Sequence, residues 1–167
     1  MVFMQHLVGR KMPSIDLEAS SGSPVNPARL VGPAVIFCYP YTGRPKYPDP
    51  PNWDQIPGAH GSTPQSLAYS EAYGNFRRLG VKLFGLSLLS VEWQRDFVSR
   101  NGLTFRLLSD ENRAFSSRLG LPLFETGGAA YLQRLTFITQ DGVIQALRYP
   151  VPEPERDAAE VLAMMRV

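Results

Sequence analysis

Two apolar runs with a helical segment between them constrain the fold more than any other feature of the chain. Residues 33–40 (Pro-Ala-Val-Ile-Phe-Cys-Tyr-Pro) form a continuous apolar run closed by proline, which is typical of a central strand buried on both faces. Residues 64–79 predict a helix that ends at Gly80, with one apolar face made of Leu67, Ala68, Ala72, Tyr73, Phe76 and Leu79. Residues 81–87 then predict a second strand. A helix between two such strands is a right-handed βαβ unit.

The rest of the chain predicts further strands and helices around this unit. The expected elements are an edge strand at 12–18, a helix at 91–101, a short strand at 105–108, a helix from Ser109 or Asp110 to Gly120, an irregular segment at 121–130, and a closing helix at 154–165 that turns Ala158, Val161, Leu162 and Met165 inward. Gln140-Asp141-Gly142, between strand-like runs at 133–139 and 143–148, is the strongest hairpin signal. This order predicts an α/β protein with a thioredoxin-like fold, a central mixed sheet flanked by helices, in a single domain spanning residues 1–167.

Composition narrows the possible functions. A chain of 167 residues with 44% apolar residues is long enough for one domain with a substantial core. The single cysteine excludes an intrachain disulfide and a cysteine-based zinc cluster, and having only two histidines, His6 and His60, argues against a metal site. The net charge of +2 comes with scattered Lys and Arg, so nucleic-acid binding is not expected. No stretch approaches the roughly 20 apolar residues of a membrane helix, and the N-terminus does not resemble a signal peptide, so we expect a cytoplasmic protein.

A long loop precedes the predicted helix and marks the candidate site. Residues 41–61 exceed the length of most connections between elements, and prolines at positions 45, 48, 50, 51 and 57 stiffen them. Ligands of open α/β sheets tend to bind beyond the carboxyl ends of the strands, which is where this loop begins. At its end, Ser62 and Thr63 can cap the helix, and Pro64 suits the first helical position. The backbone N–H groups that converge there favour an anion, and they would lower the pKa of a thiol at position 62.

Three separated segments resemble the peroxiredoxins. They are Val35–Pro40, Gly61–Leu67 and Gln133–Phe137, and the likeness extends over residues 9–165. Among these AhpC/TSA-type redoxins, the chain is most similar to the bacterioferritin-comigratory, or peroxiredoxin Q, class. The resemblance implies a thiol-dependent peroxidase that reduces hydrogen peroxide or organic hydroperoxides through a cysteine sulfenic acid. It implies no cofactor, an external thiol reductant (a thioredoxin-like protein or a low-molecular-weight thiol), and a monomer or weak dimer.

The resemblance also implies roles for five residues. Ser62 occupies the position of the peroxidatic cysteine and Leu67 that of the resolving cysteine, so the parent enzyme would be of the one-cysteine type. Pro40 would shield the pocket, and Arg134 would hold the thiolate and stabilise charge on the departing oxygen. Thr42 would orient the peroxide, although the family has its threonine a short step before the cysteine and here a long loop intervenes.

Serine at position 62 leaves two interpretations of the chain open. A hydroxyl has neither the acidity nor the polarisable sulfur of a thiol, so the chain with Ser62 is not expected to reduce peroxide. The serine is either an engineered substitution of the cysteine or an inherited one. We favour engineering, because Cys-to-Ser is isosteric and the other pocket residues are largely kept. The alternative is a natural non-catalytic peroxiredoxin-like protein that acts as a binding or interaction module.

Other chemistry-bearing residues have simpler interpretations. A hydrolase built on Ser62 and His60 is disfavoured, because position 64 is proline and no carboxylate is evident to orient the histidine. Cys38 lies within an apolar strand and is interpreted as a buried core residue without a redox role. The aromatic residues near the loop are interpreted as its packing anchors: Tyr39, Tyr41, Tyr47 and Trp53.

Overall fold

A six-stranded mixed sheet forms the centre of the protein, which we describe from a computed structural model covering residues 4–166. Its strands are β1 (Glu18–Ala19), β2 (Pro33–Cys38), β3 (Lys82–Ser87), β4 (Arg106–Ser109), β7 (Leu135–Gln140) and β8 (Val143–Arg148). They lie in the order β1-β4-β3-β2-β7-β8. Strands β2, β3 and β4 are parallel, whereas β1, β7 and β8 pair antiparallel with their neighbours. The predicted α/β class with a central mixed sheet is confirmed.

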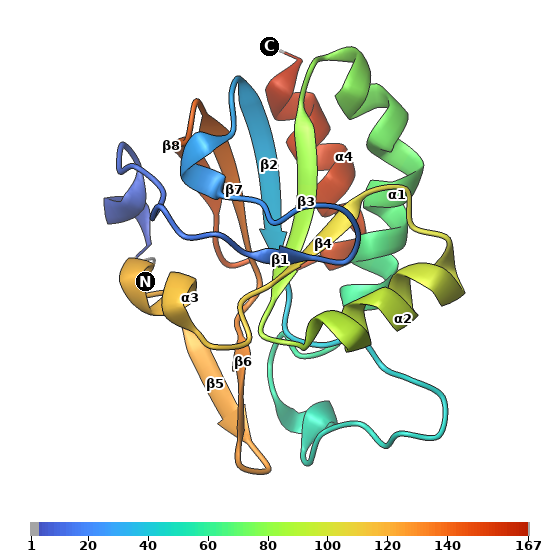
Figure 1. Ribbon diagram of the computed structural model, residues 1–167. Helices are drawn as coiled ribbons and strands as arrows, with labels where there is room; N and C mark the ends of the chain where they lie inside the picture. Colours follow the sequence, from blue (N-terminus) through green and yellow to red (C-terminus); the bar gives the residue numbers. More distant parts are fainter. Residues whose placement is uncertain (1–3, 167) are drawn as a thin grey trace.

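Helices cover both faces of this sheet, as Figure 1 shows. One face carries α1 (Ser62–Arg78), α2 (Val91–Asn101) and α4 (Pro154–Met165), with α1 and α4 packed side by side. The other face carries α3 (Ala114–Leu119) and the N-terminal segment with its 3-10 turns η1 (Gln5–Leu7) and η2 (Pro27–Arg29). A separate hairpin of β5 (Leu123–Thr126) and β6 (Ala129–Leu132) projects beyond the sheet, and loop 41–61 contains the turn η3 (Trp53–Gln55). None of the helices in residues 4–166 is long and apolar enough to cross a bilayer.

Alternation along β2 divides the core into two layers. Phe37 and Tyr39 face the layer of α1, α2 and α4, where Phe37 stacks on Tyr69 with the ring centroids 4.3 Å apart. Ile36 and Cys38 face the layer that contains α3. Ile36, Phe37, Cys38 and Tyr39 are all fully buried, so β2 is the central strand that the apolar run predicts.

Two predictions about strands are wrong. The edge strand expected at 12–18 is reduced to β1, because the chain before it binds the opposite edge instead: Met12 donates its backbone N–H to the carbonyl of Gly142, next to β8. The segment 121–130, expected to be irregular, contains most of the β5–β6 hairpin. Gly127 and Gly128 both adopt positive φ there and supply the two-residue turn.

The buried face of α1 also differs from the prediction. Leu67 and Leu79, expected to point inward, are 38% and 40% exposed, whereas Gln65 and Ser66 are fully buried together with Tyr69. Hydropathy misplaces this face because polar side chains occupy part of it. On α4 the prediction is confirmed, since Ala158, Val161 and Leu162 are buried and Met165 packs against the same layer.

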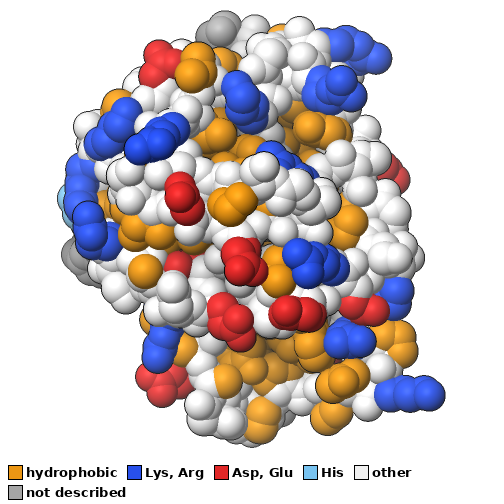
Figure 2. Space-filling model, viewed as in Figure 1, with side chains coloured by type: hydrophobic (Ala, Val, Ile, Leu, Met, Phe, Trp, Pro, Cys, Tyr) orange, Lys and Arg blue, Asp and Glu red, His pale blue; other side chains and the backbone are white. Residues whose placement is uncertain are grey.

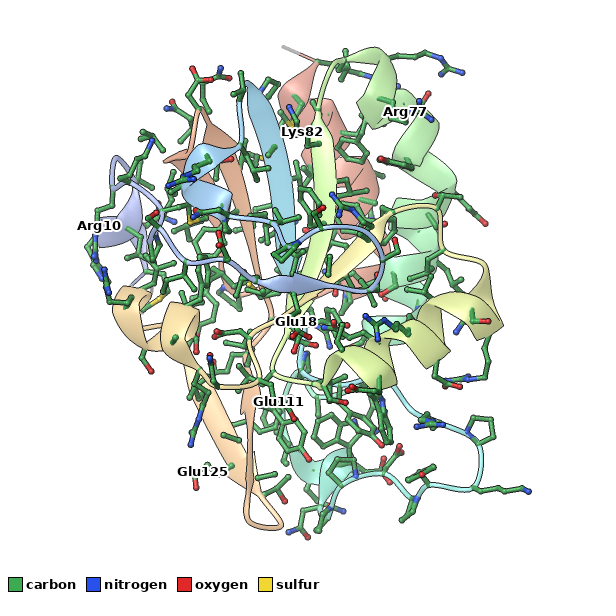
Figure 3. The ribbon with its side chains drawn as sticks, in the orientation of Figure 1. Arg10, Glu18, Arg77, Lys82, Glu111 and Glu125 are labelled. Carbon is green, nitrogen blue, oxygen red and sulfur yellow. The ribbon has the colours of Figure 1, made fainter. Side chains whose placement is uncertain are left out.

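Charged side chains of both signs are interspersed over the face of the molecule shown in Figure 2. In Figure 3, the labelled Arg77 and Lys82 lie at the upper end of the molecule, where α1 ends and β3 begins, and Arg10 lies apart from them on the other side. This face therefore carries no continuous basic stripe. Apolar side chains gather instead at its lower end, where loop 41–61 and the β5–β6 hairpin lie in Figure 1.

The turn between β7 and β8 provides a test of the packing. Asp141 and Gly142 both have positive φ, as a type I′ turn requires, and a Cβ at Gly142 would collide with the backbone of Ala28. We expect Gly142→Ala to lower the free energy of unfolding by about 2–4 kcal/mol, from backbone strain and steric overlap together. Urea unfolding followed by circular dichroism measures this loss.

The matched control is Gly32→Ala. Gly32 also has a positive φ, +76°, but a Cβ there would meet no atom within 4 Å. We expect it to lose only the backbone contribution, about 1–2 kcal/mol. Equal losses at the two glycines would contradict the steric part of the argument.

Candidate active site

Helix α1 begins where loop 41–61 ends, at the end of the sheet toward which β2 points (Figure 1). Gly61 precedes the helix with a φ of 115°, and a Cβ there would lie 2.7 Å from Pro154 at the start of α4. The start of α1 is therefore held against α4. Ser62 is the first helical residue and is 2% exposed, two positions earlier than the predicted helix start. Ser62 therefore stands at the N-terminus of α1, the positive end of the helix dipole.

Arg134, between β6 and β7, meets this helix start from the sheet side. Its Nη1 donates to Ser62 Oγ at 3.2 Å and to Gln65 Oε1 at 2.7 Å. Its Nη2 donates to the carbonyl oxygens of Gly58 at 3.1 Å and His60 at 3.0 Å. The structure thus brings together two predicted site residues, Ser62 and Arg134, that are 72 positions apart in the chain.

Burial affects the charge of this guanidinium. Arg134 is 4% exposed, and desolvation lowers its pKa to about 10, although the negative charges of Asp157 and Glu155 oppose the shift. Since this pKa remains well above neutral pH, Arg134 stays protonated there. Ser62 Oγ therefore lies between a cation and the positive end of a helix dipole, which is a setting suited to an anion.

A pocket of about 250 Å³ opens beside Ser62. Tyr41 and Trp53 line it, with their ring centroids 5.4 Å apart, and both rings contact Tyr131 of β6. Loop 41–61 is thus anchored on the β5–β6 hairpin through aromatic contacts, as predicted for Tyr41 and Trp53. Asp49 also lines the pocket and brings a carboxylate to its rim.

Two other predicted site residues, Thr42 and Pro40, make no side-chain hydrogen bond to Ser62 or Arg134 among residues 4–166. Thr42 is 1% exposed, and its hydroxyl has no hydrogen-bond partner among residues 4–166. Its neighbours in the chain, Tyr41 and Gly43, line the pocket, and its carbonyl accepts a hydrogen bond from Trp93 at 2.7 Å. Pro40 is buried at the end of β2. The roles implied for Thr42 and Pro40 stay predictions.

The surroundings of Cys38 and His60 bear on the interpretations given to these two residues. Cys38 is buried in β2, where desolvation strongly raises the pKa of its thiol, with a smaller contribution from Asp110. His60 is exposed, and its Nε2 lies 2.6 Å from Asp54 Oδ1, so the expectation that no carboxylate orients it is wrong. The hydroxyl of Ser62 is hydrogen-bonded to Arg134 instead of this imidazole. Among residues 4–166, no group of three or more His, Cys, Asp or Glu is arranged to hold a metal ion.

Two residues that support this site, Gln65 of α1 and Asp157 of α4, were not identified by the sequence analysis. Gln65 contacts Arg134 directly, and Asp157 of α4, fully buried, binds Gln65 in turn. Gln65 follows Ser62 by one helical turn, a spacing that places both on one side of α1. For Asp157 the sequence carries no comparable signal, because an acidic residue in the first turn of a helix is normally a solvated partner of the helix dipole.

A profile of the Redoxin family matches residues 7–162, which is nearly the whole chain. The chain belongs to this family. Its relatives include the chloroplastic peroxiredoxin Q of Sedum lineare. The two are 28% identical over an alignment of 170 positions, which covers 99% of this chain and 81% of that protein. The chloroplastic peroxiredoxin Q of Oryza sativa subsp. japonica is 26% identical, and the matched region covers 95% of this chain and 66% of that protein.

Solved structures agree with this assignment at the level of the fold. A Cys-to-Ser mutant of Xanthomonas campestris peroxiredoxin Q superposes with a TM-score of 0.75 at 22% sequence identity, covering 96% of this chain and 97% of that one. The predicted thioredoxin-like fold is confirmed, and the protein is a peroxiredoxin of the peroxiredoxin Q, or bacterioferritin-comigratory, class. Thiol peroxidase chemistry is the general activity of this family.

The contacts of Arg134 in this peroxiredoxin predict a structural role that can be measured separately from catalysis. We expect Arg134→Met to lower the free energy of unfolding by about 2–3 kcal/mol, because loop carbonyls and Gln65 lose a charged donor. Loop 41–61 should also become more susceptible to limited proteolysis, since its end is no longer held. The control Arg156→Met removes an exposed arginine that pairs with Glu153, and it should cost less than about 0.5 kcal/mol. Unchanged proteolysis of the Arg134 variant would contradict the anchoring role.

Proposed function

We propose that residue 62 occupies the peroxidatic position of a thiol-dependent peroxidase. A cysteine there reduces hydroperoxides, and the chain with Ser62 does not. The observation that carries this proposal is the 3.2 Å hydrogen bond from Arg134 to Ser62 Oγ at the first residue of α1. A thiol in that place has two stabilisers of its ionised form, the guanidinium and the helix N-terminus, so its pKa lies below the ordinary value of about 8.5.

Once the thiol is present, the site provides the thiolate and Arg134, and the solution provides a proton and the reducing thiols. The thiolate sulfur attacks one peroxide oxygen, an S–O bond forms, and the O–O bond breaks. The departing oxygen takes a proton from water and leaves as water or an alcohol, and Arg134 stabilises the negative charge that develops on it. An external thiol then converts the sulfenic acid to a mixed disulfide with loss of water, and a second thiol releases the enzyme. Pro40 and Thr42 keep their proposed roles of shielding the pocket and orienting the peroxide.

The residues at the other redox positions support a one-cysteine cycle. Leu67 stands at the resolving position and cannot form a disulfide, and Cys38 is fully buried in the core. The reductant is therefore an external thiol. Tyr41 and Trp53 give the pocket an aromatic wall, so organic hydroperoxides are suitable substrates.

A second candidate function is a non-catalytic binding module. It is favoured by one observation, namely that neither of the two positions assigned to redox cysteines carries a thiol, whereas Arg134 and the pocket are retained. In this case the serine is inherited, and the pocket binds a small anion or a partner protein. With an engineered serine, by contrast, the parent enzyme is the active peroxidase.

The substitution Ser62→Cys tests the proposal directly. We expect the substituted protein to consume hydrogen peroxide and tert-butyl hydroperoxide in the presence of dithiothreitol, and we expect the chain with Ser62 and a Ser62→Ala variant to be inert. In the Ser62→Cys background, Arg134→Lys should lower the second-order rate constant by about 10²-fold, because the forked donor is lost while the charge is kept.

Two outcomes would contradict this function. If the Ser62→Cys protein is folded and its thiol is alkylated by iodoacetamide, yet peroxide is not consumed, the thiol peroxidase is excluded and the binding module stands. If the chain with Ser62 gives a burst of nitrophenol from p-nitrophenyl acetate that Ser62→Ala abolishes, the serine itself is a nucleophile and the hydrolase interpretation must be restored.

A further inference from the structure

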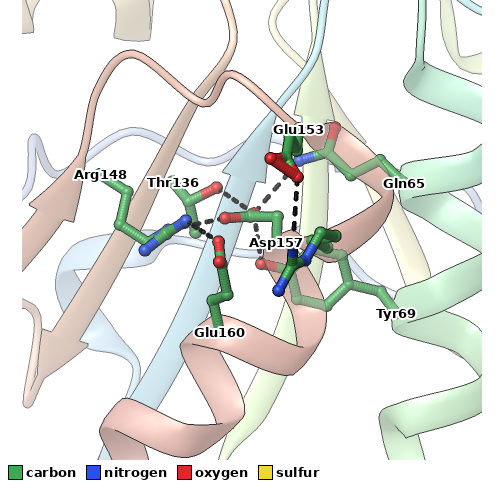
Figure 4. Close-up of polar contacts among 8 residues, drawn as sticks. Gln65, Tyr69, Thr136, Arg148, Glu153, Asp157 and Glu160 are labelled. Atoms are coloured by element: carbon green, nitrogen blue, oxygen red, sulfur yellow. Dashed lines mark hydrogen bonds and ion pairs between the residues drawn. The ribbon is translucent and has the colours of Figure 1, made fainter.

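Beneath the candidate site, Asp157 of α4 collects hydrogen bonds from three other elements (Figure 4). Its Oδ2 accepts from Tyr69 Oη at 2.6 Å and Gln65 Nε2 at 3.2 Å, both on α1, and from Thr136 Oγ1 of β7 at 2.7 Å. Its Oδ1 accepts from Arg148 Nε of β8 at 2.8 Å. The side chain is completely buried. A buried carboxylate with four donors is a fixed point in the structure, because each donor would lose its partner if the carboxylate moved.

Gln65 connects this carboxylate to Arg134. A carboxylate accepts hydrogen bonds and a guanidinium only donates them, so an amide between the two can satisfy both in one orientation only. Nε2 must face Asp157 and Oε1 must face Arg134, as is found, at 3.2 Å and 2.7 Å. The same Nη1 that binds Gln65 Oε1 also donates to Ser62 Oγ. The orientation of one buried amide therefore determines where the guanidinium lies relative to residue 62.

We propose that Asp157 is a positioning residue for the site: through the side-chain amide of Gln65, it fixes the Arg134 guanidinium beside residue 62. Among residues 4–166, Asp157 makes no hydrogen bond to Ser62 or Arg134, although its negative charge raises the pKa of Arg134. Its effect is transmitted by the direction of the amide. The inference rests on the proposed function only insofar as a thiol at position 62 serves as the reporter.

The surrounding donors keep this direction fixed. Burial, and then the negative charge of Asp157, raise the pKa of Tyr69 well above its ordinary value, so its hydroxyl remains a donor to the carboxylate. Arg148 is held on the solvent side by a second carboxylate, Glu160, at 2.6 Å from its Nη2. Asparagine at position 157 has a single side-chain acceptor oxygen for these four donors. Gln65 would then no longer be held in one orientation. If it turned its NH₂ group toward Arg134, two donors would face each other and the guanidinium would move away.

A positioning role and a direct charge effect predict opposite signs. Removing a negative charge near a thiol favours the thiolate and lowers the pKa of the thiol. Releasing Arg134 removes the cation that stabilises the thiolate and raises that pKa. Asp157→Asn, introduced together with Ser62→Cys, should therefore raise the pKa of the introduced thiol by about 1, the lower end of the effect of a neighbouring opposite charge. The pKa is obtained from the pH dependence of the iodoacetamide alkylation rate, mapped by mass spectrometry to position 62.

Two further variants complete the experiment. Gln65→Met breaks the connection without a change in charge and leaves Asp157 its other three donors, so it should raise the thiol pKa by about the same amount. Combining it with Asp157→Asn should add little, because the two residues act in one chain of hydrogen bonds. Glu160→Gln is the matched control: it removes a carboxylate from the same helix that contacts Arg148 but not Gln65, and the thiol pKa should not change.

The outcomes separate this inference from the proposed function. A lowered or unchanged thiol pKa in a folded Asp157→Asn protein overturns the positioning role. If that protein does not fold, an unchanged pKa in the Gln65→Met protein overturns it equally. Alkylation needs no peroxide turnover, so the inference can hold when the peroxidase proposal fails. Where turnover is present, kcat/KM at neutral pH should fall in both variants in step with the loss of thiolate, by at most about tenfold for a pKa rise of about 1.

Discussion

The site depends on the hydrogen bonds that the buried guanidinium of Arg134 donates. This group donates to loop carbonyls at positions 58 and 60, to Gln65 and to Ser62, so one side chain joins the end of the long loop, the first turn of α1 and the start of β7. Removing a charge from water is costly, and geometry with several good acceptors is what offsets the cost. Any change at these partners is therefore transmitted to the guanidinium, and through it to residue 62.

The last helix of the chain completes this arrangement from the opposite side. Pro154 approaches Gly61 so closely that no side chain fits at position 61, and Asp157, one turn further along α4, reaches Gln65 and Tyr69 on α1. Helices α1 and α4 thus share apolar contacts and a buried polar network at the same junction. For this reason the position of residue 62 depends on a segment more than ninety residues away in sequence.

The sequence predicts those parts of the protein whose pattern is local. Strand β2 and the Asp141-Gly142 turn are each predicted from residues that are adjacent in the sequence, and both predictions are confirmed. The inward face of α1 is not, because Gln65 and Ser66 are buried where hydropathy expects Leu67. Burial of Gln65 makes sense only in the presence of Asp157 and Arg134, which belong to distant elements. The β5–β6 hairpin was missed although Gly127-Gly128 is itself a recognised turn signal.

The groups around position 62 can be compared with what a serine hydroxyl and a cysteine thiolate each offer them. These surroundings offer donors, the guanidinium of Arg134 and the backbone N–H groups of α1, and they lower the pKa of the arginine through burial. A thiolate is only an acceptor and carries the charge that offsets the buried cation. A serine hydroxyl also accepts such bonds, but it brings no charge, and its own proton needs an acceptor. The site is thus electrostatically incomplete with serine, and an anion at this point, whether a thiolate sulfur or a bound ligand, supplies what the arrangement of donors lacks.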